Sequence, residues 1–267
     1  MKLFTTLLLL FVFISCANSK NRAYTASTPA SPLVKTFLGI PLTDSIDFIR
    51  WNLTLDDDKY SINCNYGIGK PNTNGFYNGG KKVSFSGQLK KEKNTYLLQN
   101  GDHILKLAEL NNNLLHVLNS DNSLLVGGGG WSYALNNLSP VLTDQVYINA
   151  KRTVLADSIA FVGRTPCGIP NIPKSAQCYK LKWSLVLYSN NTYKLRGTAW
   201  EKEGGKRADW KIVEGKDGRI IYQLNDDKGN PYIHLLKLDE GVVIFTDEKG
   251  NLLVGDHDFS YTLNRKS

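Results

Sequence analysis

The sequence predicts an all-β protein that contains two tandem small antiparallel β-barrels. Apolar and polar residues alternate with a period of two over many short runs, and clusters of Asn, Asp and Gly separate these runs, as expected for strands joined by tight turns. A shift of 128 residues aligns residues 124–127 with 252–255 and residues 131–136 with 259–264, which indicates two homologous units. We expect each unit to close into a barrel because closure removes exposed strand edges.

Residues 1–15 are typical of a secretory signal peptide. Lys2 is followed by an apolar run that ends at Ile14 and is too short to span a bilayer. Cys16 follows Ser15 at the place where cleavage is expected, and this arrangement resembles the lipobox of bacterial lipoproteins. We therefore expect a lipid anchor on Cys16 that attaches the protein to a membrane. The alternative is an ordinary secretory signal in which Cys16 has no role.

Residues 16–32 are mostly small and polar and include two prolines, a composition that predicts a flexible, lipidated tether. No Asp follows Cys16 directly and no acidic cluster comes after it. By resemblance to other lipoproteins, this favours attachment to the outer membrane of a Gram-negative cell. The folded part is then expected in the periplasm.

The two units are predicted at residues 33–142 and 159–267, with residues 143–158 as the linker between them. In the first unit, Trp51 begins a strand in which apolar residues alternate with polar ones, and Trp183 begins the matching strand in the second. The remaining strands follow between turns rich in Asn, Asp and Gly. Each unit is therefore expected to be a meander of short strands.

The opening of each unit carries a recurring pattern. Residues 161–167 read Phe-Val-Gly-Arg-Thr-Pro-Cys ahead of the Trp-x-Leu-x-Leu strand at Trp183, and residues 37–39 read Phe-Leu-Gly ahead of the same strand at Trp51. After a lipobox, this pattern resembles the NlpE N-terminal-domain family of envelope lipoproteins, here in two copies. The resemblance implies lipocalin-like barrels and a role in copper homeostasis or envelope stress.

The cysteines of the second unit are predicted to form a disulfide. Cys167 and Cys178 flank a loop with two prolines in an exported protein, where disulfides are common. A redox-active or metal-binding pair is the alternative. The family resemblance would place the second cysteine three positions after the first, but the spacing here is eleven, so we assign no metal site. Cys64 shares one strand face with apolar neighbours and is expected to be a buried free thiol.

Charge and motifs exclude several functions. Loss of Lys2 with the signal peptide leaves 31 basic against 24 acidic residues, a formal charge of +7 that weakly favours anionic partners. The basic residues form no continuous stripe, so no nucleic-acid partner is expected. No acid pair, catalytic triad or metal cluster recurs in both units, so we expect neither an enzyme nor a cofactor. Four histidines are scattered along the chain, at His103, His116, His234 and His257.

Two functions remain as hypotheses. The first is a binding or envelope-sensing module that holds a small amphipathic ligand in the mouth of a barrel lined by Trp51, Trp131 and Trp183. In that hypothesis the barrels are hollow, whereas barrels of eight strands are often filled by their own side chains. The second is a structural lipoprotein that scaffolds a complex of envelope proteins.

Overall fold

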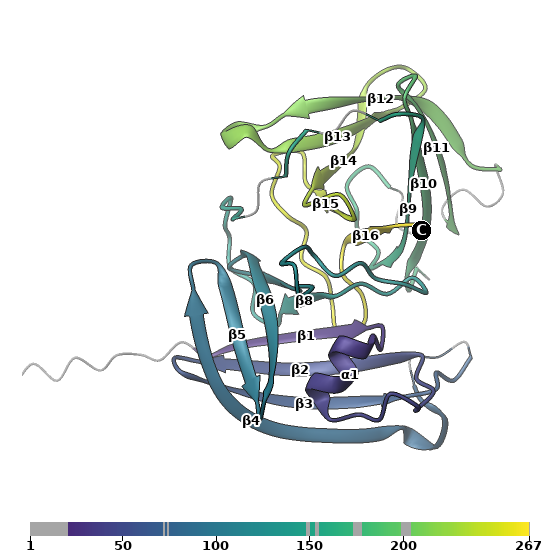
Figure 1. Cartoon of the computed structure of the whole chain (residues 1–267). Coiled ribbons are helices and arrows are strands. Elements are labelled where there is room, and N and C mark those ends of the chain that lie inside the picture. The colour runs from purple at the N-terminus through teal and green to yellow at the C-terminus, as the bar shows by residue number, and fades with distance from the viewer. Residues whose placement is uncertain are drawn as a thin grey trace, which may run out of the picture.

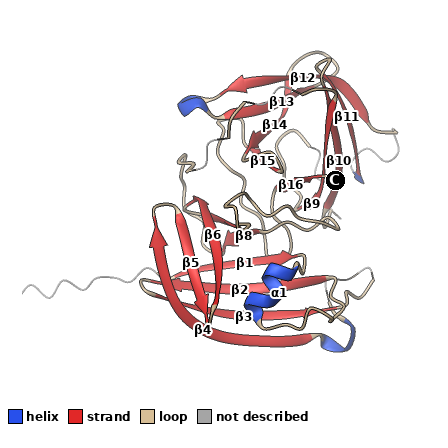
Figure 2. Ribbon diagram, viewed as in Figure 1, coloured by secondary structure: helices blue, strands red, loops and turns tan. Residues whose placement is uncertain are grey.

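The computed structural model describes residues 21–71, 73, 75–147, 150–152, 155–172, 178–198 and 204–266. The predicted signal peptide and Cys16 lie outside these residues. Within them, no helix is long and apolar enough to cross a membrane. Strands make up almost all of the regular structure, as Figure 2 shows.

The first barrel is closed, and all neighbouring strands are antiparallel. Its helix is α1 (Pro32–Leu38), and residues Tyr77–Gly79 add a single 3₁₀ turn. Its strands are β1 (Arg22–Thr28), β2 (Phe48–Asp56), β3 (Lys59–Gly67), β4 (Lys81–Glu92), β5 (Thr95–Asn100), β6 (His103–Asn111), β7 (Leu114–Val117) and β8 (Ala134–Asn137).

The second barrel repeats this order of strands, and its described residues contain no counterpart of α1 (Figure 1). Residues Lys216–Gly218 form a 3₁₀ turn. Its strands are β9 (Ser158–Thr165), β10 (Leu181–Tyr188), β11 (Thr192–Gly197), β12 (Lys206–Glu214), β13 (Ile220–Asn225), β14 (Pro231–Lys237), β15 (Val242–Thr246) and β16 (Thr262–Arg265). The predicted fold class, two tandem antiparallel β-barrels, is confirmed.

Strand β1 corrects the predicted tether. Residues 22–28, expected to be flexible, pair with β2 along their whole length and with β8 at the other edge. Tyr24 and Ala26 point into the core, where they are fully buried. Small polar residues suggested a linker, but the barrel needs this eighth strand for closure. The first domain therefore begins at Arg22 instead of residue 33.

The repeat is also corrected at its opening. Residues 37–39 lie at the end of α1 and just after it, so they do not match residues 161–163, which lie in β9. In the repeat, the strand equivalent to β9 is β1, because β9 pairs with β10 and β16 as β1 pairs with β2 and β8. In both barrels a threonine on this strand accepts a hydrogen bond from the core tryptophan: Trp51 Nε1 donates to Thr28 Oγ1, and Trp183 Nε1 donates to Thr165 Oγ1, each at 2.8 Å.

Helix α1 packs against the core of the first barrel. The Ser31 hydroxyl accepts a hydrogen bond from Val34 N at its start, and Gly39 ends it with a φ of 67°. Phe37 of the helix meets the rings of Tyr60 and Phe85 at centroid distances of 6.3 and 5.8 Å. The helix therefore adds apolar side chains to the barrel interior.

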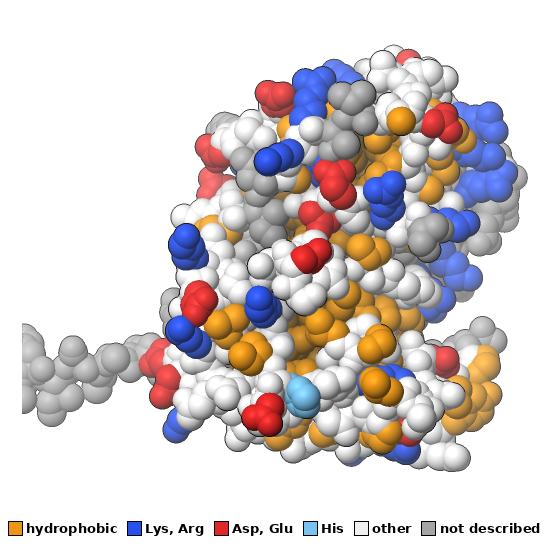
Figure 3. All heavy atoms as spheres, in the orientation of Figure 1, with side chains coloured by type: hydrophobic (Ala, Val, Ile, Leu, Met, Phe, Trp, Pro, Cys, Tyr) orange, Lys and Arg blue, Asp and Glu red, His pale blue; other side chains and the backbone are white. Residues whose placement is uncertain are grey.

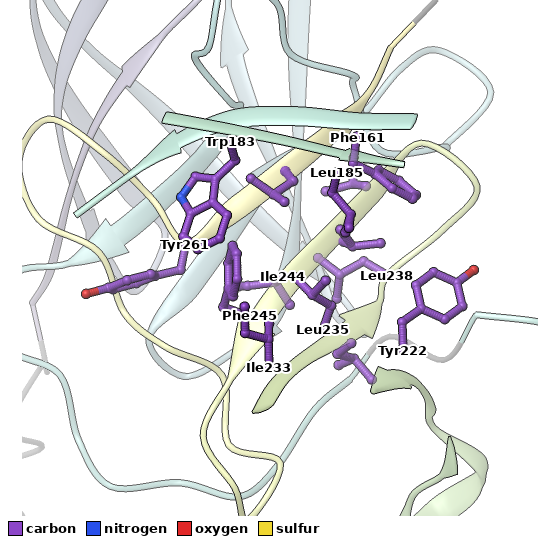
Figure 4. Close-up of a cluster of buried hydrophobic side chains, with 14 of the residues drawn as sticks. Phe161, Trp183, Leu185, Tyr222, Ile233, Leu235, Leu238, Ile244, Phe245 and Tyr261 are labelled. Carbon is purple, nitrogen blue, oxygen red and sulfur yellow. The ribbon is translucent and has the colours of Figure 1, made fainter. Parts of the chain in front are cut away.

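Side chains also meet inside the second barrel. Figure 4 shows residues from opposite strands pointing toward one another, and Trp183 lies 4.6 Å from Phe245 between ring centroids. Trp183 is 4% exposed, and Trp51 of the first barrel is 1% exposed. Both tryptophans are core residues bonded to threonine, so they do not line an open ligand site.

The barrels pack together through residues that are equivalent in the repeat. Ser132 and Ser260 share a hydrogen bond of 2.6 Å between their hydroxyls. The Asn136 side chain accepts from the backbone N–H of Gly255 at 2.9 Å, and Asn264 accepts from that of Gly127 at 2.7 Å. Both glycines are required because a Cβ there would lie 2.1 Å from a backbone oxygen. Apolar residues of both barrels complete the contact, including Leu110, Leu114, Leu124, Leu236, Leu238 and Leu252.

Candidate functional site

The predicted disulfide is present. Cys167 and Cys178 are joined across the loop between β9 and β10, with 6.2 Å between their Cα atoms. The Tyr261 hydroxyl donates to the carbonyl oxygen of Cys167 at 2.8 Å and holds this loop against the barrel. The disulfide therefore fixes a loop that is also hydrogen-bonded to the barrel, as expected of a structural disulfide.

Cys64 is the free cysteine of the described residues and is buried, as predicted. Burial raises the pKa of its thiol well above the usual range, which keeps it protonated and unreactive. His116 is also fully buried, and burial lowers its pKa to about 4. Among the described residues, no group of three or more His, Cys, Asp or Glu side chains lies together as a metal site requires.

A charged cluster closes one end of the first barrel. Glu109 is 2% exposed and forms ion pairs with Arg22 at 2.8 Å and Lys91 at 2.5 Å. Burial opposes ionisation of Glu109, but the hydrogen bonds from Lys91 and Arg22 keep its pKa below the ordinary value. The Tyr96 hydroxyl also donates to this carboxylate, at 3.1 Å. Every charge is paired, so this cluster stabilises the barrel and offers no free group to a ligand.

Trp131 lies between the barrels, which differs from its predicted place in a barrel mouth. Its ring stacks on Phe48 of the first barrel at 4.7 Å and on Phe259 of the second at 5.1 Å between centroids. Phe76 extends the stack beyond Phe48 at 4.3 Å, and Tyr179 meets Phe259 edge-on at 6.0 Å. These five rings, here called the aromatic seam, join the two barrels.

Cations flank the aromatic seam. The Arg50 guanidinium lies 5.9 Å from the Phe48 ring and forms an ion pair with Asp258 of the second barrel at 2.8 Å. Arg164 lies 5.4 Å from the Trp131 ring, and Lys180 lies 5.6 Å from that of Phe259. Ring stacking and paired charge therefore hold the barrels together on this side.

A larger group of cations, which shares Arg164 with the aromatic seam, covers the outer surface of β9–β12. Trp183 and Tyr193 face the core, and successive residues of a strand point to opposite faces. The neighbours of these two residues, such as Lys182 and Lys194, therefore face outward. The group, here called the basic face, consists of Arg164, Lys182, Lys194, Arg196 and Arg207. Figure 3 shows Lys and Arg side chains gathered at the right of the upper barrel, over the strands labelled β10 and β11 in Figure 1.

Strand register places these cations beside one another. Lys182 lies directly opposite Arg164, and Lys194 directly opposite Arg207. Like charges at such positions, about 5 Å apart between Cβ atoms, destabilise a sheet. The guanidinium groups of Arg196 and Arg207 lower the pKa of Lys194, as expected for crowded positive charge. None of the five forms an ion pair with an acidic residue of the described parts of the chain.

The corresponding face of the first barrel lacks this charge. The Trp51 and Trp183 strands have the same register with their neighbours, so each outward position has a counterpart. Four of the five counterparts are uncharged, namely Ser27, Ser61, Asn63 and Ser86. The fifth is Arg50, whose charge is paired with Asp258. The fold does not need the basic face, because the same fold exists without it in the same molecule.

Sequence reasoning missed the basic face. Alternation in Lys194 and Arg196 marked outward positions of one strand, but the register that brings Arg164 and Arg207 beside them was not visible. No protein family, no curated protein and no solved structure matches this chain, so the resemblance to the NlpE family stays a prediction.

Proposed function

We propose that this protein is a non-catalytic binding module of the cell envelope, lipid-anchored through Cys16, that binds an anionic ligand on the basic face. The observation that supports the proposal is the difference between the two barrels. Five adjacent cations replace four uncharged residues and one paired arginine at matching positions. Unpaired charge that weakens a sheet is expected where it serves binding.

The barrel interiors support a surface site over an enclosed one. Trp51 and Trp183 are core residues, and Trp131 is clamped between two other rings. An amphipathic ligand would have to displace these contacts to enter. On the basic face, Lys182, Arg196 and Arg207 are exposed and can meet a partner directly, whereas Arg164 lies against the Trp131 ring.

The partner chemistry follows from the spacing of the charges. The directly opposed pairs, Arg164 with Lys182 and Lys194 with Arg207, have Cβ atoms about 5 Å apart, so their charges are close enough to suit a polymer with a carboxylate or phosphate on each unit. Attraction of this kind weakens strongly with salt because the charges lie at the surface. A polyanionic envelope polymer is therefore the proposed class of ligand.

The test is a variant in which residues of the basic face are replaced by their counterparts from the first barrel. In the variant K194S/R196N/R207S, the basic face receives the side chains that the same fold carries at Ser61, Asn63 and Ser86, so folding should be kept. Binding to sodium polygalacturonate is measured by microscale thermophoresis with the soluble chain from Asn21. At about 1 kcal/mol per cation, the triple variant should bind roughly 100-fold more weakly at low salt.

A matched control separates this site from net charge. The variant K93S/K228S/K249S removes three exposed turn lysines and changes the net charge equally. It should keep most of the affinity. Equal losses in both triple variants would show that total charge alone attracts the polymer, and no loss in either would refute the proposal.

A scaffold for envelope proteins is the second candidate, and exposed apolar residues of the connecting segment favour it. Leu142 is fully exposed, and Leu138 and Val141 are exposed beside it, at positions where a partner could cover them. A protein complex that persists in the basic-face variant but is lost when these three residues are serine would support this candidate.

A further inference from the structure

Little chain separates the anchoring cysteine from the first barrel. Strand β1 begins at Arg22, so Cys16 is only six residues away. Six residues reach at most about 20 Å when fully extended. A lipid on Cys16 would therefore hold one end of this barrel close to the membrane.

The strand register identifies that end. Arg22 lies opposite Leu55, so the chain enters beside the β2–β3 turn at residues 57–58. The β4–β5 turn at residues 93–94 and the β6–β7 turn at residues 112–113 lie at the same end, because Glu109 near the last turn bonds to Arg22. Figure 1 shows β1 beginning at the left of the lower barrel, beside these turns.

We propose that this hairpin end, made of residues 56–59, 90–95 and 111–114, is the membrane-facing surface of the anchored protein. The proposal rests on the lipidation of Cys16 in the proposed function, and its occupant is the bilayer that carries the anchor. Among the described residues, no large apolar side chain within these three segments is exposed, and the exposed Leu138 and Val141 lie beside them, since Leu138 N donates to Ala23 O and Val141 N to Asn113 Oδ1. The segments themselves carry charges of both signs, with three acids at residues 56–58 and an ion pair between Lys90 and Glu92, so they suit contact with the headgroup layer.

This orientation restricts which anionic ligands can reach the basic face. In the shared view of Figures 1 and 3, β1 begins at the left of the lower barrel, whereas Lys and Arg gather at the right of the upper one. Headgroups of the anchoring leaflet are then held away from β9–β12. The basic face is directed at a polyanion that lies off the membrane surface.

The test is amine footprinting of the full chain in isolated cell membranes. Acetylation of lysines is read by mass spectrometry for the native protein and for a variant with a 20-residue Gly-Ser spacer after Ala17, which adds about 25 Å of reach. Lys59, Lys90 and Lys93 report on the hairpin end, and Lys194 and Lys211 on the second barrel. The spacer should raise acetylation of the first three at least about twofold and leave the other two unchanged.

The same spectra distinguish the two ways of failing. An acylated Cys16 peptide with equal acetylation of Lys59, Lys90 and Lys93 in both chains would overturn the orientation and leave the anchor intact. A Cys16 peptide without acyl mass would overturn the anchor and the orientation together. Neither result affects binding of polygalacturonate by the soluble chain, which tests the basic face separately.

Discussion

Replacement of Thr28 by Val would test whether residues 22–28 belong to the barrel. The Thr28 hydroxyl accepts the hydrogen bond of Trp51 Nε1 at 2.8 Å, and both side chains are at most 1% exposed. Valine keeps the shape and the β-branch but leaves the indole N–H buried without an acceptor. Such a loss costs about 1–3 kcal/mol. The free energy of unfolding of the first barrel should fall by about 2 kcal/mol, roughly a 30-fold change in the ratio of folded to unfolded protein.

Urea denaturation of the chain from Asn21, followed by tryptophan fluorescence, measures this change. The control is Thr54→Val, the same chemical change at a half-buried outward position of β2, which should stay within about 0.5 kcal/mol of the parent. If both variants unfolded at the same urea concentration, Thr28 would not contact Trp51. The segment would then be the tether that its composition suggests.

Three further predictions follow from the same contacts. A chain that begins at Ser31 lacks β1, and limited proteolysis should degrade its first barrel while the second stays resistant. The reason is that the missing Tyr24 alone contributes about 3–5 kcal/mol to the stability of the first barrel. Equal resistance of both barrels would contradict the closed barrel. Replacing Cys167 and Cys178 by Ser should lower the unfolding free energy by about 3 kcal/mol in urea, since the bond closes a short loop; a change below about 1 kcal/mol would argue against a structural disulfide. Burial lowers the pKa of His116 from 6.5 to about 4, so as the pH falls the unfolded chain binds a proton at this residue before the folded chain does. The contribution of neutral His116 to the free energy of unfolding is therefore complete above pH 6.5 and is lost as the pH falls toward 4. His116→Ile, the residue at the matching position 244, should remove a slope of up to about 1.4 kcal/mol per pH unit in that window, and an unchanged slope would assign it to another group.

Periodicity and the internal repeat were enough to predict two all-β units. Alternation around Trp51 and Trp183 is a local signal, because each strand must place one face in the core. The second unit's disulfide was also predictable, since two cysteines flank one loop of an exported chain. These features depend on neighbours in sequence, so reading along the chain could find them.

The failures have a common physical cause. Strand β1 is rich in Ala, Ser and Thr, and its stability comes from pairing with β2 and β8, the second of which is more than 100 residues away. A Thr-Pro pair at residues 28–29 and again at 165–166 was the signal that could have aligned β1 with β9. The place of Trp131 depends on packing between barrels, and the basic face depends on register across four strands. Neither can be read from one strand alone.

The reciprocal contacts of Asn136 and Asn264 have a consequence for how the molecule arose and what it can do. Each barrel offers the other the same residues, which is how the subunits of a symmetric homodimer meet. In a homodimer, the positions of Ser27 and Arg164 would be encoded by a single codon and would hold the same residue. A basic face on one subunit would then appear on both. Fusion of two copies into one chain removes that constraint. The molecule keeps the matching contacts of Ser132 with Ser260 and of the two asparagines, and is free to differ at other positions.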